Sequence, residues 1–174
     1  MNLRLLLLLG ILSIKMVASD PSIVIGYGAS QLNSPDSDTS SGVTTYSLGL
    51  SQDFSSNETE SVRLSGLFNT NRDENLTLLS EIELQVALKK KVTPRQSVAV
   101  GFQVAIPLTS SFDDYEIKGS GFGVNIGYSL QVIDSISWNI VGKSTAYTLD
   151  IHSSETFDRL TNQTITTYVS IGVD

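Results

Sequence analysis

Two residues with catalytic potential lie two positions apart near the end of the chain. His152 is the only histidine, and Ser154 follows it with Glu155 alongside. On an extended strand, residues two apart share a face, so the imidazole could take a proton from the serine hydroxyl while an acid orients the ring. The surrounding segment is rich in serine and threonine, and so short a motif also arises as part of a polar loop. We favour the polar-loop interpretation and keep the pair as a candidate.

A second candidate site is a set of charges within stretches of apolar and small residues: Arg63, Glu81, Glu83 and Lys143. Arg63 and Glu81 lie at similar distances from the polar segment 69–74, so a hairpin would place them close together. Glu83 lies one inward position further along, and Lys143 could approach from the opposite wall. Because a buried charge requires a partner, we predict an ion network that seals a lumen. The alternative is a gate or narrow pore, for which a small barrel has little room.

The composition excludes several kinds of site. The chain has no cysteine, which rules out disulfides, thiolate metal sites and thiol nucleophiles. Its glycines are not followed by a helical pattern, so they do not form a phosphate-binding loop. We therefore predict no metal and no cofactor. The formal net charge of −7 argues against nucleic acid as a partner.

The elements that would position these residues are β-strands, because apolar residues recur at every second position. There are eight such stretches, and the connections between them are alternately longer polar segments and short turns. The longer segments are 31–43, 69–74, 110–114 and 150–163, and the turns are 55–60, 92–95 and 134–135. This rhythm predicts an all-β fold, an eight-stranded antiparallel up-and-down transmembrane β-barrel with both ends on one side. A change of parity after Tyr115 and Ile117 predicts a bulge near 119–121.

The polar face of the strands decides what surrounds the barrel. Two neighbouring stretches present small neutral residues on that face: Ala99, Gly101, Gln103, Ala105, Gly121, Gly123, Asn125, Gly127 and Ser129. A soluble barrel usually exposes Lys and Glu to water, whereas small residues suit a crowded lumen. We therefore expect Leu84, Val100 and Ile126 to face lipid. The alternative is a soluble calycin-like barrel that binds an apolar ligand, with these three residues inside.

Aromatic residues fall mostly near the strand ends, as in the interfacial girdles of membrane barrels. We place Phe54 and Trp138 toward the inner side and Phe68, Tyr115 and Tyr147 toward the outer side.

The first 19 residues have the features of a secretory signal peptide. Arg4 precedes an apolar run of about ten residues, and small residues follow before Asp20. We predict a cleaved signal peptide at 1–19 and a single barrel domain at 20–174. Its removal takes away Arg4 and Lys15, which makes the mature chain two charges more negative.

As a whole, the chain resembles the OmpX-like and OmpA-type small outer-membrane barrels in its export signal, eight alternating strands, short inner turns and longer outer loops. The resemblance implies a monomer in the outer membrane of a Gram-negative bacterium, without enzymatic activity. It implies a structural or surface-interaction role, in envelope integrity or adhesion. The implied partners are outer-membrane lipid and lipopolysaccharide, together with the barrel assembly machinery during biogenesis.

The spacing of His152 and Ser154 before the last strand is also similar to that in the outer-membrane lipid A deacylases, which implies lipid A deacylation as an alternative activity. In that family an Asn follows the Ser, where this chain has Glu155. The acidic partner comes near the start of the last strand, where this chain has Thr164 and Thr166.

Overall fold

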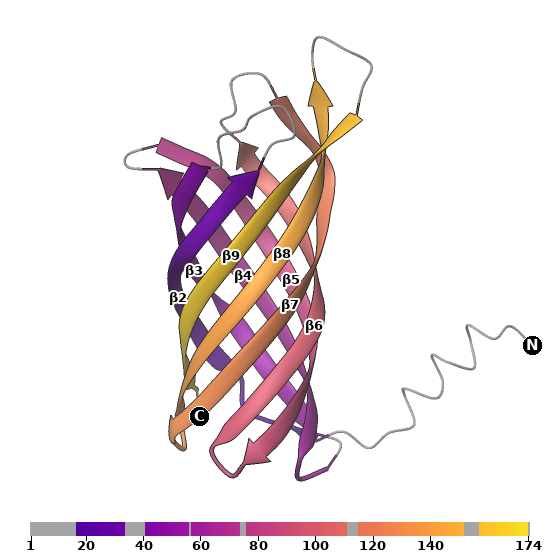
Figure 1. Ribbon diagram of the computed structural model, residues 1–174. Helices are drawn as coiled ribbons and strands as arrows, with labels where there is room; N and C mark the ends of the chain where they lie inside the picture. Colours follow the sequence, from indigo (N-terminus) through magenta and orange to yellow (C-terminus); the bar gives the residue numbers. More distant parts are fainter. Residues whose placement is uncertain are drawn as a thin grey trace, which may run out of the picture.

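Eight antiparallel strands close into a barrel in the computed structural model (Figure 1). The structure describes residues 17–33, 41–55, 57–73, 76–110, 115–151 and 157–173. The barrel strands are β2 (Ser22–Asn33), β3 (Ser41–Ser55), β4 (Glu60–Asp73), β5 (Leu76–Thr93), β6 (Gln96–Ser110), β7 (Tyr115–Ile133), β8 (Ile136–Ile151) and β9 (Phe157–Gly172). Each strand pairs with its neighbours in the chain, and β2 pairs with β9 to close the wall. No helix in the described part of the chain is long and apolar enough to cross a membrane.

The two ends of the barrel differ in their connections. At one end, which we call the turn end, β3 joins β4, β5 joins β6 and β7 joins β8. Ser22 lies opposite Gly172 there, so the first and last barrel strands start and finish at the same end, as predicted. We call the opposite end the loop end. A two-residue strand, β1 (Val17–Ala18), pairs with the turn end of β3 and lies within the predicted signal peptide, so its removal leaves the eight barrel strands.

The wall has an apolar outer face and a polar inner face, because successive side chains on a strand point to opposite sides. Leu84, Val100 and Ile126 are 53%, 60% and 67% exposed. Most of the buried residues are instead polar, and every barrel strand carries at least one of them. The prediction of outward apolar residues is therefore confirmed. The soluble alternative is wrong, because it required these three residues inside the barrel.

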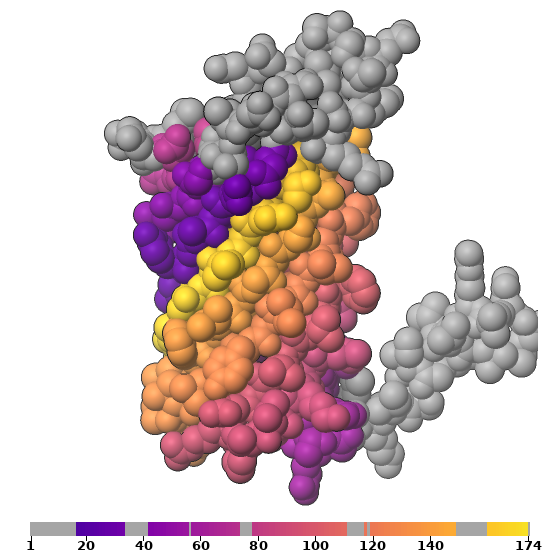
Figure 2. Space-filling view, in the orientation of Figure 1, coloured from indigo at the N-terminus to yellow at the C-terminus, as the bar shows by residue number. Residues whose placement is uncertain are grey.

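The strands tilt steeply across the wall, and Figure 2 shows β2, β9 and β8 running side by side as diagonal bands. They also run further toward the loop end than predicted. The prediction of a loop at 69–74 is wrong, since β4 continues to Asp73 and β5 begins at Leu76. Asn69 and Asn71 are polar because they point into the lumen, where both are buried. Similarly, β3 begins at Ser41 and β9 at Phe157, inside segments that were predicted as loops.

The predicted bulge near 119–121 is confirmed. The pairing of β7 with β8 shifts register between Lys118 and Phe122. Gly119 has a φ of 77°, a conformation that glycine adopts without the steric cost of a side chain. The extra residues restore the parity that Ile117 breaks, so Phe122 and Val124 point outward with the rest of the strand.

Candidate functional site

The catalytic candidates His152 and Ser154, with Glu155, lie outside the described residues. β8 ends just before them at Ile151, and β9 begins after them at Phe157. The described residues also contain no group of three or more His, Cys, Asp or Glu side chains that could hold a metal ion. The candidate functional side chains among the described residues are therefore those of the lumen.

A buried ion pair crosses the lumen toward the loop end. Lys143 Nζ on β8 lies 2.7 Å from Glu83 Oε2 on β5, and the two side chains are 4% and 1% exposed. Gln85 donates a hydrogen bond to the other oxygen of Glu83, and Asn69 donates to both Glu83 and Glu81. Lys143 thus approaches Glu83 from the opposite wall. The pair links two strands that are not neighbours, so it ties the barrel together across its interior.

Tyr147 closes the lumen beyond this pair. Its hydroxyl donates a hydrogen bond to Glu81, and its ring is 1% exposed. It packs with Leu79, Ala105 and Leu160, which together form an apolar plug. The prediction that Tyr147 belongs to an outer aromatic girdle is wrong. The bulge lies in β7 alone, so β8 keeps its alternation and Tyr147 points inward like Lys143. By contrast, Phe68 and Trp138 face outward as predicted.

A second charged cluster lies at the turn end. Asp53 Oδ1 is 2.7 Å from Arg63 Nε, and Asp53 Oδ2 is 2.7 Å from Lys89 Nζ. A further guanidinium nitrogen of Arg63 donates to Asp53 Oδ2 at 3.1 Å, so the contact is bidentate. Arg63 also donates to Asn139 across the lumen at 3.3 Å. These three charged side chains are 16–20% exposed, so water reaches them.

The predicted proximity of Arg63 and Glu81 is wrong. Arg63 lies opposite Ala87 in the β4–β5 ladder, and Glu81 lies opposite Asn69. The hairpin turns between Asp73 and Leu76, later than the loop assumed from the polar residues, and this moves the register. The predicted single network is therefore two clusters, with Arg63 in one and Glu81, Glu83 and Lys143 in the other.

Sequence reasoning missed Asp53 and did not use Lys89, although a signal for both was present. Asp53 continues the inward alternation of Thr45, Ser47 and Ser51 on β3, and Lys89 continues that of β5. Charges near a strand end are easily assigned to an exposed turn. Here the polar lumen extends to that end, which lets them pair inside it.

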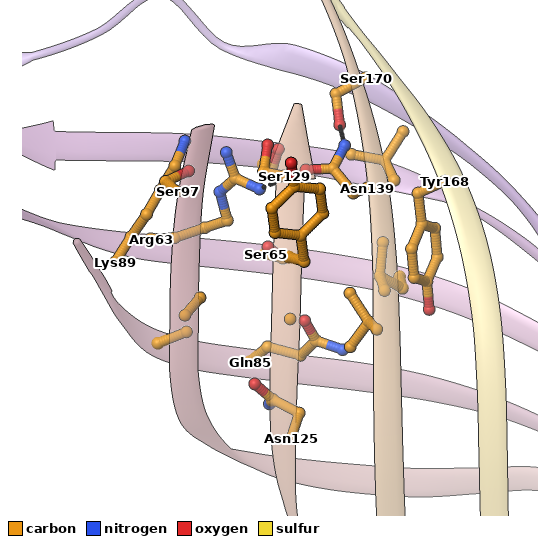
Figure 3. Close-up of a pocket in the computed structure, with 18 residues that line it drawn as sticks. Arg63, Ser65, Gln85, Lys89, Ser97, Asn125, Ser129, Asn139, Tyr168 and Ser170 are labelled. Atoms are coloured by element: carbon orange, nitrogen blue, oxygen red, sulfur yellow. Dashed lines mark hydrogen bonds between the residues drawn. The ribbon is translucent and has the colours of Figure 1, made fainter. Parts of the chain in front are cut away.

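A cavity lies in the lumen beside the turn-end cluster (Figure 3). Arg63, Lys89, Ser97 and Ser129 border it on one side, and Tyr168 lies across from them. The tyrosine ring lies over Gly26, where a Cβ atom would be 2.4 Å from the ring. From the loop end to the turn end, the lumen therefore holds an apolar plug, an ion pair, a cavity with apolar and polar walls, and a charged cluster.

Comparison with known proteins identifies the fold. No protein-family model matches the sequence, and no curated protein sequence matches it significantly. Among solved structures, Neisserial surface protein A is similar with a TM-score of 0.58 and 12% identity, over 90% of this chain and 99% of that one. A de novo designed transmembrane β-barrel has a TM-score of 0.49 and 11% identity, over 90% and 100% of the two chains. Ail, the attachment invasion locus protein of Yersinia pestis, has a TM-score of 0.48 and 12% identity, over 87% and 98%. The likeness to the Neisserial protein places this chain in the fold class of small eight-stranded barrels.

Proposed function

We propose that the chain is an outer-membrane β-barrel of a Gram-negative bacterium, without enzymatic activity, whose loop end faces the surroundings of the cell. The observation that carries this proposal is the inverted wall, apolar outside and polar inside. Outward residues such as Leu48, Phe102 and Ile165 are 57%, 75% and 67% exposed, and water would penalise so large an apolar surface. A bilayer instead stabilises it.

The size of the apolar surface fits a membrane. On β6 the outward apolar residues run from Val98 to Leu108. Eleven residues at about 3.3 Å each, tilted by about 45°, span roughly 25 Å, which is the height of the apolar band of outer-membrane barrels. A closed barrel also satisfies its backbone hydrogen bonds within the wall, as a spanning structure must.

The contents of the lumen favour a structural or surface-interaction role over transport. The plug of Leu79, Ala105, Tyr147 and Leu160 is at most 2% exposed, and the Lys143–Glu83 pair lies beneath it. Such a lumen stabilises the wall and leaves the loops to make contacts, as loops on rigid scaffolds commonly do. The similar Neisserial structure is that of a surface protein, which supports the same orientation for the loop end. Envelope integrity and adhesion are the roles that we propose.

The proposed partners follow from this location. Outer-membrane lipid and lipopolysaccharide would surround the wall, and the barrel assembly machinery would insert the chain after its signal peptide is removed. The wall closes on itself through the pairing of β2 with β9, so it needs no second copy to cover an edge. We therefore propose a monomer.

Two measurements test the location and the orientation. The first is gel migration of the membrane-extracted protein in mild detergent, with and without boiling, because a closed barrel resists detergent until it is heated. We expect a heat-dependent shift in the outer-membrane fraction. Recovery of the protein in the soluble fraction, with no shift, would refute the proposal.

The second measurement uses the absence of cysteine, since a single introduced thiol is then the only one to label. Asp73→Cys lies at the exposed loop end of β4, and Asp134→Cys lies in the exposed turn after β7. With a membrane-impermeant maleimide, we expect Asp73→Cys to be labelled on intact cells and Asp134→Cys only after the outer membrane is permeabilised. The opposite pattern would invert the proposed orientation.

A further inference from the structure

The cavity in the lumen is small and has both apolar and polar walls. Its volume available to the centre of a water molecule is about 50 Å³, which is room for on the order of four waters. Arg63 and Lys89 also line an open basin at the turn end, together with Lys91 and the carboxylates of Asp20, Asp53, Glu58, Glu60 and Asp134. The charged cluster therefore lies between the cavity and the solvent at that end, while the Tyr147 plug closes the other end.

Several hydrogen-bonding groups of the cavity have no protein partner. Tyr168 is 3% exposed, and no other described residue accepts or donates a hydrogen bond to its hydroxyl. The hydroxyls of Ser97 and Ser129, which are 6% and 8% exposed, also make no hydrogen bond to the described part of the chain. Buried polar groups in native proteins nearly always have a partner. These donors therefore indicate that the cavity holds a polar ligand or water.

The charges around the cavity favour a negative ligand. Arg63 and Lys89 share one carboxylate, Asp53, and the residues that line the cavity include no other carboxylate. The cluster thus carries one excess positive charge in a partly buried site, where an uncompensated charge is costly. Glu81 balances that charge over the whole lumen, but it lies in the loop-end network and accepts hydrogen bonds from Tyr147 and Asn69.

We propose that the cavity is a binding site for a small inorganic anion, such as chloride or nitrate, that enters from the turn end. Arg63 and Lys89 would supply the charge, and the hydroxyls of Ser97 and Ser129, which lie beside them in Figure 3, would donate hydrogen bonds. The site depends on the lumen alone and is independent of the role of the loops.

The test is a titration of the full chain, refolded in detergent micelles, with sodium nitrate replacing sodium gluconate at constant ionic strength. Gluconate is a larger and strongly hydrated anion, so it serves as the reference. We expect saturating NMR shifts of the Arg63 Nε–H and of the backbone amides of Ser97 and Ser129. Shifts that stay linear in nitrate, or that never exceed those in gluconate, would overturn the proposal and leave a cavity that holds water only.

Two neighbouring lysines provide a matched control. Lys89→Gln removes the excess charge and leaves Asp53 and Arg63 as a neutral pair, whereas Lys90→Gln removes an outward lysine that is 68% exposed. We expect Lys89→Gln to weaken nitrate binding by about tenfold or more, because charge drives the binding, and Lys90→Gln to leave it unchanged. Equal affinities in both variants would overturn the proposal.

A third variant keeps the test valid if Lys89→Gln does not fold. Ser129→Ala removes only a hydroxyl that lies beside Arg63 in Figure 3, and it leaves the charges intact. We expect nitrate affinity several-fold lower than in the unmodified protein, with the heat-dependent gel shift retained as evidence of folding. Unchanged affinity in Ser129→Ala would remove this hydroxyl from the site and overturn the geometry proposed here.

Discussion

Tyr147 lies against Gly121 so closely that a Cβ atom on Gly121 would be 2.5 Å from Cε1 of the tyrosine ring. Tyr168 and Gly26 have the same relationship toward the turn end, where the corresponding distance is 2.4 Å. In both pairs, the glycine belongs to the strand beside that of the tyrosine. The two large rings in the lumen therefore fit because the neighbouring strand lacks a side chain at that position.

We expect Gly121→Ala to destabilise the barrel by about 1–3 kcal/mol, the usual cost of overpacking a core. The added methyl group would also lie 2.9 Å from Thr145 Cγ2, so it would collide with two side chains at once. The measurement is the free energy of unfolding in urea, with the protein inserted in lipid vesicles. The matched control is Gly66→Ala. Gly66 faces outward, and a Cβ atom added there would lie 3.8 Å from its nearest neighbour, Leu84 Cδ2. A cost for Gly121→Ala no greater than that of the control would contradict the close packing.

Lys143→Met should be among the most destabilising single changes in the chain. It leaves Glu83 buried without its cation, which costs about 3–5 kcal/mol in comparable sites. The same urea experiment measures it. Adding Glu83→Gln should restore part of the loss, because Glu81 then has no second carboxylate beside it and keeps its hydrogen bonds from Tyr147 and Asn69. Lys90→Met is the control, because Lys90 and Glu60 are 3.6 Å apart and largely exposed, so its cost should stay within about 1 kcal/mol. If the double variant is as unstable as Lys143→Met, packing rather than charge explains the effect.

The alternation of the sequence was enough to predict the barrel, the outward apolar residues and the bulge before Phe122. It was enough because one-sided burial repeats at every second residue, whatever the tertiary contacts are. It also predicted the approach of Lys143 to Glu83 from opposite walls. Register was harder to predict. Asn69 and Asn71 are polar residues of a kind common in loops, but they lie on a strand and point into the lumen.

The errors in the candidate site follow from that register. The predicted hairpin turned too early in the sequence, so Arg63 was expected near Glu81. The predicted alternation of β8 ended too soon, so Tyr147 was expected at the membrane interface. Asp53 was missed for a related reason, since a charge close to a turn has no distinctive pattern of its own. Closure of the barrel brings Asp53 and Lys89 together from non-adjacent strands, and no local sequence feature encodes such a contact.

Tyr147→Phe should separate the hydrogen bond of Tyr147 from its packing. The ring stays in the plug, but Glu81 loses a buried donor, and a hydrogen bond to a charged group contributes about 1.5–3 kcal/mol. Tyr27→Phe is the control, because Tyr27 faces outward, is 61% exposed and makes an edge contact with Tyr46 through its ring. We expect urea unfolding in vesicles to show a clear loss for Tyr147→Phe and less than about 0.5 kcal/mol for the control. Equal losses would show that the hydroxyl of Tyr147 does not stabilise the plug.

Ser154→Ala tests whether the chain also has an enzymatic activity. If His152 and Ser154 belong to a polar loop, lipid A from cells that express the variant should have the same mass as lipid A from cells with the unmodified protein. Both should also match cells that lack the gene. Lipid A that is one acyl chain lighter only with the unmodified protein would establish deacylation, and the surface-interaction proposal would then be incomplete.

The depth of a charge on the outer wall provides the sharpest test of membrane insertion. Leu84 and Leu88 lie on the same face of β5 and are 53% and 66% exposed, but Leu84 lies near the middle of the apolar band and Leu88 near its turn-end edge. Arginine on the lipid face of a barrel costs about 2–4 kcal/mol at the bilayer midplane and about 0–1 kcal/mol near the interface. In vesicles, we therefore expect Leu84→Arg to lower the free energy of unfolding by several times as much as Leu88→Arg. A barrel surrounded by water would tolerate both changes equally, because neither side chain is buried in protein, so equal and small effects would refute the outer-membrane location.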